Sequence, residues 1–187
     1  MKPKRTSPAD INASSPMDRC QTPASAIVPL LPYLDPRWVV WEPASGEGLL
    51  VEALRSHGFE VIDGDILTGQ NYFLYEPPNY QVQITNPSYT TKHFWFERAA
   101  ELGKPFGLLV PVESIGTARF QRVIKQHGIK NFQLLLLDKR VNFKMPYKGF
   151  EGDGWKSAAQ FPVMWLCYKL LPELIVYGEL PKESADA

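Results

Sequence analysis

Residues 41–48 read Trp-Glu-Pro-Ala-Ser-Gly-Glu-Gly, and this stretch decides the fold that we predict for the chain. It continues the apolar residues 38–41, which predict a buried strand, and it leads into residues 48–57, whose apolar side chains share one helical face. Gly58 stands where such a helix is expected to end. A strand that turns through glycines into a helix is the first half of a strand–helix–strand unit. The stretch therefore predicts an α/β protein.

The rest of the chain continues this alternation. Short loops separate the elements, and most strands are continuous apolar runs, as expected when both faces of a parallel sheet are covered. We predict a three-layer α/β fold on a mostly parallel sheet, closed by an antiparallel last strand at residues 163–168. The further predicted strands are residues 60–62, 82–85, 106–110 and 132–137, and the further predicted helices are residues 24–34, 92–102 and 117–126.

Length and composition indicate one globular domain. The 187 residues suffice for a substantial core, and 44% hydrophobic with 21% charged residues is ordinary for a soluble protein. We expect the domain to span residues 21–180, with flexible tails at residues 1–20 and 181–187 because these ends are polar and lack periodicity. The start of the chain has no apolar segment typical of a signal peptide, and no apolar run is long enough for a membrane span.

Charge and cysteine usage limit the partners, the metal sites and the cellular location that we expect. The 20 basic residues balance the 20 acidic ones, so a nucleic-acid contact would need a local basic patch. The two cysteines and three histidines lack metal-site spacing, which predicts no metal. A reducing, cytoplasmic location is expected.

The glycines of the first stretch suit a bound ligand. Gly46 and Gly48 permit a tight turn that lets backbone N–H groups approach a ligand closely. Asp63 and Asp65, at the end of the next strand, are candidate acceptors for ribose hydroxyls. Val51 occupies the third glycine position of a dinucleotide fingerprint, so a nucleoside with an amino-acid tail fits better than a pyrophosphate. The alternative is that the glycines only turn a strand into a helix.

A second motif, Asn86-Pro87-Ser88-Tyr89, follows a predicted strand. An amino group conjugated to an aromatic ring is a poor nucleophile, and two acceptors on its hydrogens stabilise the charge that develops on nitrogen. The Asn86 side-chain oxygen and the Pro87 carbonyl are candidate acceptors, and Tyr89 offers a face on which a base can stack. Pro87 restricts Asn86 to an extended conformation. The alternative is a plain Asn-Pro turn.

Together these motifs resemble those of class I S-adenosylmethionine-dependent amino-methyltransferases, most closely the adenine-N6 DNA methyltransferases of phages and restriction–modification systems. The resemblance covers roughly residues 20–170. It implies a Rossmann-like methyltransferase fold, S-adenosylmethionine as cofactor, and DNA as substrate. The family's catalytic motif is similar to Asn86-Pro87-Ser88-Tyr89, although the family usually has proline at the position of Ser88.

The resemblance also implies site residues. The family's upstream element is similar to Thr22-Pro23, which implies contact with the methionine end of the cofactor, and Asp65 takes the ribose role, with Asp63 as the alternative. Asn71 is implied near the cofactor's adenine. Sequence-specific members of this family also carry a target-recognition region, and a separate subunit is one way to supply it. The implied cofactor residues are Thr22, Pro23, Glu42, Ala44, Gly46, Gly48, Asp63, Asp65 and Asn71.

Residues 138–160 are the candidate substrate region, because basic residues that bind phosphates alternate there with aromatic residues that stack on bases. Lys144, Lys148 and Trp155 are the predicted contacts. The alternative is a solvated loop that joins two edge strands.

The function predicted is methylation of an exocyclic amino group, with adenine N6 in DNA as the first choice. RNA adenine and a protein glutamine are the alternative substrates, because similar corners serve them in related enzymes. A catalytically silent module that binds nucleic acid or a protein is the alternative from another class.

Overall fold

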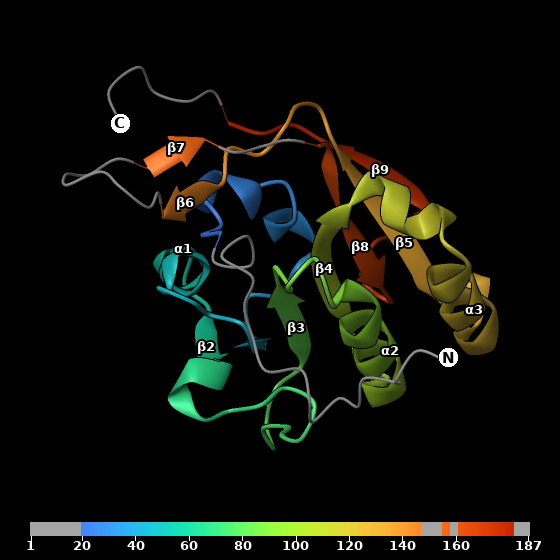
Figure 1. Cartoon of the computed structure of the whole chain (residues 1–187), viewed down its shortest axis with the longest axis horizontal. Helices are drawn as coiled ribbons and strands as arrows, with labels where there is room; N and C mark the ends of the chain where they lie inside the picture. Colours follow the sequence, from blue (N-terminus) through green and yellow to red (C-terminus); the bar gives the residue numbers. More distant parts are fainter. Residues whose placement is uncertain (1–19, 147–154, 158–160, 182–187) are drawn as a thin grey trace, which may run out of the picture.

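A seven-stranded sheet forms the centre of the computed structural model, which describes residues 20–146, 155–157 and 161–181, with only the backbone at 144–146 and 155–157. The strand order is β2-β1-β3-β4-β8-β5-β9. Strands β6 (Lys144–Pro146) and β7 (Trp155–Ser157) form a separate antiparallel pair beside the sheet (Figure 1). The sheet strands are β1 (Val39–Glu42), β2 (Glu60–Asp63), β3 (Val82–Thr85), β4 (Phe106–Pro111), β5 (Phe132–Leu137), β8 (Val163–Tyr168) and β9 (Ile175–Gly178).

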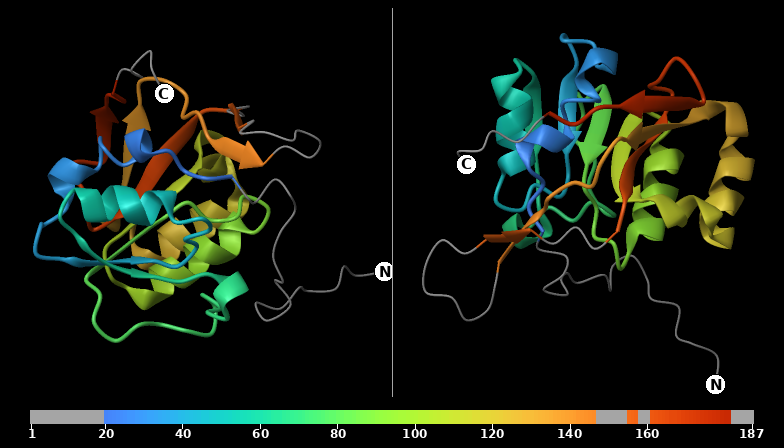
Figure 2. Two further views of the ribbon diagram at one scale, coloured as in Figure 1. Left: turned by 90° about the vertical axis from the view of Figure 1, so that its left-hand side faces the viewer. Right: turned by 90° about the horizontal axis from the view of Figure 1, so that it is seen from above.

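Helices cover both faces of the sheet, which makes three layers (Figures 1 and 2). Helix α1 (Leu49–Ser56) packs on one face, where Leu50 and Leu54 join a buried cluster with Val40 and Ile84. Helices α2 (Lys92–Leu102) and α3 (Ala118–His127) pack side by side on the other face. Their buried residues include Phe96 and Phe120, whose rings stack 4.5 Å apart. The predicted three-layer α/β fold is confirmed.

Strand β8 is antiparallel to both β4 and β5, as predicted. It is not the last strand, because β9 follows it and pairs in parallel with β5 at the edge of the sheet. The prediction missed β9, although residues 174–177 read Leu-Ile-Val-Tyr; Leu174, Ile175 and Tyr177 are exposed at this edge of the sheet. Since β8 inserts between β4 and β5, residues 138–160 join two interior neighbours, and the alternative of a loop between edge strands is wrong.

The predicted helix at residues 24–34 is also wrong. The segment instead forms two short 3-10 helices, η3 (Ala24–Ala26) and η4 (Leu31–Tyr33), separated by a turn. Pro29 and Pro32 lack the backbone N–H that a continuous α-helix needs at these positions. Pro23 precedes η3, and Thr22 provides no side-chain cap. The segment still packs on the sheet, because the Trp165 indole donates to the Ala26 carbonyl at 2.9 Å.

The order of the strands identifies one position on the sheet where a ligand is expected to bind. Strand β1 pairs in parallel with β2 on one side and with β3 on the other, so the chain moves outward from β1 to β2 and then crosses back to β3. In open α/β sheets, ligands bind beyond the carboxyl ends of the strands where the chain reverses direction in this way. Glu42 ends β1 and Thr85 ends β3, so both predicted motifs begin at this place.

The predicted tails fall almost entirely outside the described residues. Within the described part of the chain, every helix is too short or too polar to cross a lipid bilayer.

Candidate functional site

The glycine turn links β1 to α1 in a conformation that only glycine adopts without strain. Gly46 has φ +53° and Gly48 has φ +89°, both in the left-handed region. Gly48 is the N-cap of α1, so the turn lies at the positive end of a helix, while its backbone N–H groups donate to acceptors of the chain itself. The tight turn from strand to helix that the glycines predicted is confirmed, and the approach of its N–H groups to a ligand stays a prediction.

Glu42 supports this turn from below. Its side chain is 1% exposed, and its Oε1 accepts hydrogen bonds from the Ala44 N–H at 2.8 Å and from the Thr85 hydroxyl at 2.5 Å. Burial raises the pKa of Glu42 to about 8, although both hydrogen bonds oppose the shift. Through these two hydrogen bonds the Glu42 carboxyl ties the turn to the end of β3.

The two predicted ribose acids lie on different elements. Asp65 Oδ2 accepts from the Gly46 N–H at 3.0 Å, and Asp65 Oδ1 accepts from the Leu67 N–H at 2.8 Å, where it caps a short 3-10 helix. Each oxygen keeps a second lone pair for a ligand. Asp63 ends β2 opposite Glu42, and its Oδ1 accepts from the Arg55 guanidinium at 2.6 Å. Asp65 is thus the acid in direct contact with the glycine turn.

Asn71 begins a segment that packs against α2. Its side-chain oxygen accepts from the Phe73 N–H at 2.9 Å. The next residue, Tyr72, is buried, and its ring stacks on Trp95 of α2 at 4.3 Å between centroids. A role for Asn71 near an adenine stays a prediction.

The Asn-Pro-Ser-Tyr corner follows β3 directly. Asn86 Oδ1 is buried, and no described residue donates a hydrogen bond to it. Pro87 is buried, and its carbonyl accepts no backbone hydrogen bond from the described residues. A buried acceptor without a donor costs roughly 1–3 kcal/mol, so a protein keeps one mainly where a ligand supplies the donor. The two acceptors predicted for an amino group are therefore both open.

Ser88 connects the corner to α2. Its hydroxyl lies 2.9 Å from the Thr90 hydroxyl and accepts from the Thr91 hydroxyl at 3.1 Å. Lys92, the first residue of α2, donates from Nζ to the Tyr89 carbonyl at 3.0 Å. These contacts order the corner where the resembling family has a second proline.

Tyr89 packs among aromatic side chains. Its ring lies 6.3 Å from Phe143 and 5.7 Å from Phe161. Burial, with smaller effects of Cys20 and Glu113, raises the pKa of the Tyr89 hydroxyl well above its ordinary value, and this hydroxyl has no partner among the described residues. Among the described residues, the ring is held in place by apolar contacts.

The segment at residues 20–23 lies over the glycine turn. Gln21 Oε1 accepts from the Glu47 N–H at 3.0 Å, and the Gln21 amide lies so close to Gly46 that a Cβ there would be 2.8 Å from Nε2. Thr22 is buried beside it and Pro23 is half-buried. The structure thus brings the predicted upstream element to the turn. Sequence reasoning missed Gln21, whose proximity to the Thr22-Pro23 element was the only available signal.

Two of the three predicted substrate contacts lie in the β6–β7 pair. Lys148 lies outside the described residues. Lys144 and Trp155 belong to β6 and β7, where only the backbone is described.

Solved structures resemble this chain. A protein from Listeria monocytogenes assigned to the class I S-adenosylmethionine-dependent methyltransferases matches with a TM-score of 0.54 and 18% identity, over 91% of this chain and 68% of that one. The chain has the fold of these methyltransferases. A modification subunit attributed to a type I restriction enzyme of Vibrio vulnificus matches with a TM-score of 0.47 and 14% identity, over 94% of this chain and 50% of that one. No protein-family model matches the sequence, and no curated protein is significantly similar to it.

Proposed function

We propose that this chain uses S-adenosylmethionine to methylate an exocyclic amino group, with adenine N6 in DNA as the substrate. One observation carries the proposal: Asn86 Oδ1 is a buried acceptor without a donor, at the carboxyl end of β3 and next to the glycine turn of the methyltransferase fold. The two N–H bonds of an amino group would satisfy Asn86 Oδ1 and the Pro87 carbonyl together.

The reaction needs little from the protein beyond this contact. The amine nitrogen attacks the methyl carbon, the carbon–sulfur bond breaks to leave a neutral thioether, and the nitrogen then loses one proton to solvent. Two acceptors on the amino hydrogens stabilise the positive charge that develops on nitrogen. The remaining requirement is alignment of nitrogen, methyl carbon and sulfur.

The cofactor would lie across the turn between β1 and α1. Gly46 and Gly48, with the adjacent Ala44, shape the backbone on which it rests, and Glu42 supports them. Asp65, with Asp63 beyond it, would accept the ribose hydroxyls. Thr22 and Pro23 would cover the methionine end, and Asn71 would approach the adenine.

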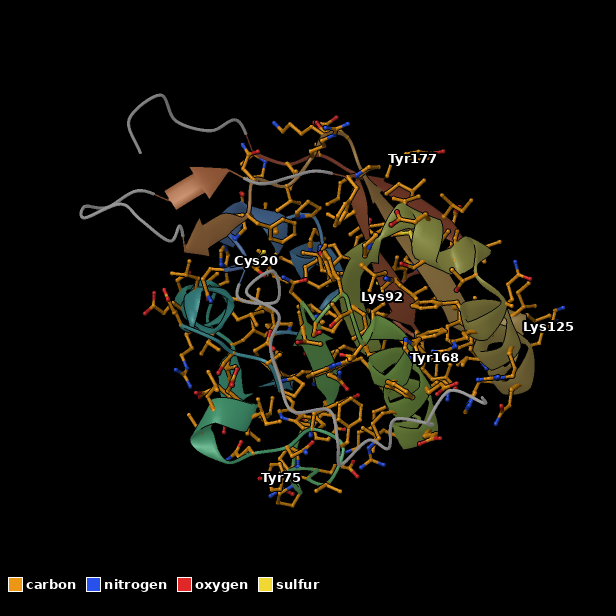
Figure 3. The ribbon with its side chains drawn as sticks, viewed as in Figure 1. Cys20, Tyr75, Lys92, Lys125, Tyr168 and Tyr177 are labelled. Atoms are coloured by element: carbon orange, nitrogen blue, oxygen red, sulfur yellow. The ribbon has the colours of Figure 1, made fainter. Side chains whose placement is uncertain are left out.

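Charge is segregated in a way that favours a nucleic-acid substrate. Residues 20–91, which include the cofactor turn, hold 8 acidic and 2 basic residues, whereas residues 92–140 hold 9 basic and 4 acidic ones. Arg119, Arg122 and Lys125 are exposed along α3, which has no acidic residue, and Lys92 begins the neighbouring α2 (Figure 3). Such cations bind phosphates, so the balanced overall charge conceals a basic surface along α3, where Arg122 also pairs with Glu97 of α2.

Methyl transfer from radiolabelled S-adenosylmethionine to adenine-containing oligonucleotides tests the proposal. Asn86→Ala should lower the rate about 10²–10³-fold, as expected when one transition-state contact is lost, without weakening cofactor binding. Asn86→Asp keeps an acceptor and should retain part of the activity. Asn79→Ala, at an exposed asparagine, is the matched control and should behave as wild type.

Parallel reactions with DNA, RNA and a glutamine peptide separate the substrate classes. Transfer to RNA or to the peptide alone would correct the substrate. Equal and negligible transfer by wild type and Asn86→Ala, with cofactor still bound, would support a silent binding module, for which Ser88 in place of proline is the motivating feature.

Salt dependence gives an independent measure of the substrate. If Arg119 and Arg122 contact phosphates, the double change to Gln should reduce the slope of log affinity against log salt by about 1–2. Lys104 precedes β4 and Lys169 follows the antiparallel β8, so both lie at the opposite end of the strands from Asn86, and their double change to Gln should leave the slope unchanged.

A further inference from the structure

Every backbone N–H of the glycine turn, from Ala44 to Gly48, donates to an acceptor of the chain itself. Three of these acceptors are local to the sheet end: the Glu42 carboxyl, the Gly64 carbonyl and the Ser45 carbonyl. The other two are side chains from outside the turn. They are Asp65 on the Gly46 N–H and Gln21 on the Glu47 N–H.

The hydrogen bond from the Glu47 N–H to Gln21 can be broken with a smaller structural change than the local hydrogen bonds of the turn. The local contacts are made by the strand and the turn, so their loss would disturb the sheet end. Gln21 reaches the turn from 26 residues away, and a rotation of its side chain is enough to free the Glu47 N–H. Gln21 is 7% exposed, so its amide fills the space directly over Gly46.

We propose that Gln21 accepts from the same Glu47 N–H that the α-carboxylate of the cofactor binds. Gln21 therefore competes with this carboxylate and lowers the affinity for ligands that carry it. The inference rests on the proposed function, because it assumes that S-adenosylmethionine binds at this turn. The Gln21 amide oxygen is neutral, and it accepts from the Glu47 N–H in the place of a carboxylate oxygen. A charged carboxylate makes the stronger hydrogen bond and displaces it.

The proposal predicts opposite effects for two substitutions. In Gln21→Ala the ligand-free turn loses the hydrogen bond on the Glu47 N–H, whereas in the bound state the carboxylate of the cofactor still accepts from it, so S-adenosylmethionine should bind about threefold to tenfold more tightly. In Gln21→Glu a carboxylate competes at the same N–H and repels that of the cofactor, so binding should weaken by at least about tenfold.

The ligand itself supplies the sharpest control. Methylthioadenosine contains the nucleoside and the thioether but no amino-acid carboxylate, so it does not compete with Gln21. Its affinity should be the same for wild type, Gln21→Ala and Gln21→Glu. Gln121→Ala, at an exposed glutamine of α3, is the matched protein control and should bind both ligands as wild type does.

Isothermal titration of the full chain with both ligands decides the question. Opposite shifts for S-adenosylmethionine with no shift for methylthioadenosine support the inference. Weaker binding of S-adenosylmethionine by Gln21→Ala would show that Gln21 is itself a ligand contact, and equal affinities would show that it is a bystander; either result overturns the inference and leaves the proposed function intact. Failure of wild type to bind S-adenosylmethionine would overturn both.

Discussion

The Thr85 hydroxyl donates a hydrogen bond of 2.5 Å to Glu42 Oε1, and this bond joins the ends of the neighbouring parallel strands β1 and β3. Both side chains are at most 1% exposed. The residue after Thr85 is Asn86, and the same Glu42 oxygen accepts from Ala44 in the glycine turn. One buried carboxyl group therefore links the glycine turn to the strand end that leads into Asn86.

Thr85→Val should destabilise the protein by about 1–3 kcal/mol, because it leaves a buried carboxyl oxygen with one donor fewer. Thr85→Ser keeps the hydroxyl and should cost about 1 kcal/mol for the lost methyl group. Urea denaturation measures both. Equal losses for the two variants would show that the hydroxyl contributes nothing.

The pH dependence of stability should report Glu42. Its pKa is about 8 in the folded protein, whereas an unfolded glutamate has a pKa near 4.3. The folded state therefore holds a proton that the unfolded state has lost between these values, so the contribution of Glu42 is complete below about pH 4.5 and is lost as the pH rises to about 8.

Glu42→Gln copies the protonated form and should remove this slope. The free energy of unfolding of wild type should fall by a few kcal/mol relative to Glu42→Gln between about pH 5 and 8. Glu52→Gln, at an exposed glutamate of α1, should follow wild type across the range. A wild-type curve parallel to that of Glu42→Gln would mean that Glu42 is already ionised in the folded state.

Two glycines of the turn should respond differently to alanine. Gly48→Ala introduces a Cβ with no atom within 4 Å, so it should cost only the strain of positive φ, about 1 kcal/mol. Gly46→Ala has the same strain and also forces the Gln21 amide away, so it should cost about 1 kcal/mol more. Adding Gln21→Ala to Gly46→Ala should recover most of that difference in urea denaturation; no recovery would place the clash elsewhere.

Tyr89→Phe should raise the free energy of unfolding by about 1 kcal/mol, because it removes a buried hydroxyl that has no partner among the described residues. Methyl transfer should persist, since the ring keeps its contacts with Phe143 and Phe161. Tyr177→Phe is the control, because Tyr177 is 81% exposed and its hydroxyl is solvated. A destabilised Tyr89→Phe would reveal a hydrogen bond to this hydroxyl.

Local sequence pattern predicted the elements whose residues bury an apolar face. The strands β3, β5 and β8 and the helix α2 lie at the predicted bounds. Hydrophobic periodicity does not predict an element correctly where the burial of the side chains does not follow the periodic pattern. The prolines at residues 29 and 32 break an otherwise helical apolar pattern, and the apolar run at residues 174–177 forms the edge strand β9 with most of its side chains exposed rather than buried.

The sequence by itself determined where the two motifs lie along the chain and which residue types they contain, because turns and strand ends depend on a few neighbouring residues. Only the tertiary structure decided which atoms meet. Glu42 contacts Thr85 across 43 residues and Gln21 contacts Glu47 across 26, and both contacts exist only once the sheet order is set. Burial is also decided by the tertiary structure. Folding removes Asn86 Oδ1 from water and raises the pKa of Glu42, and the sequence alone predicts neither effect.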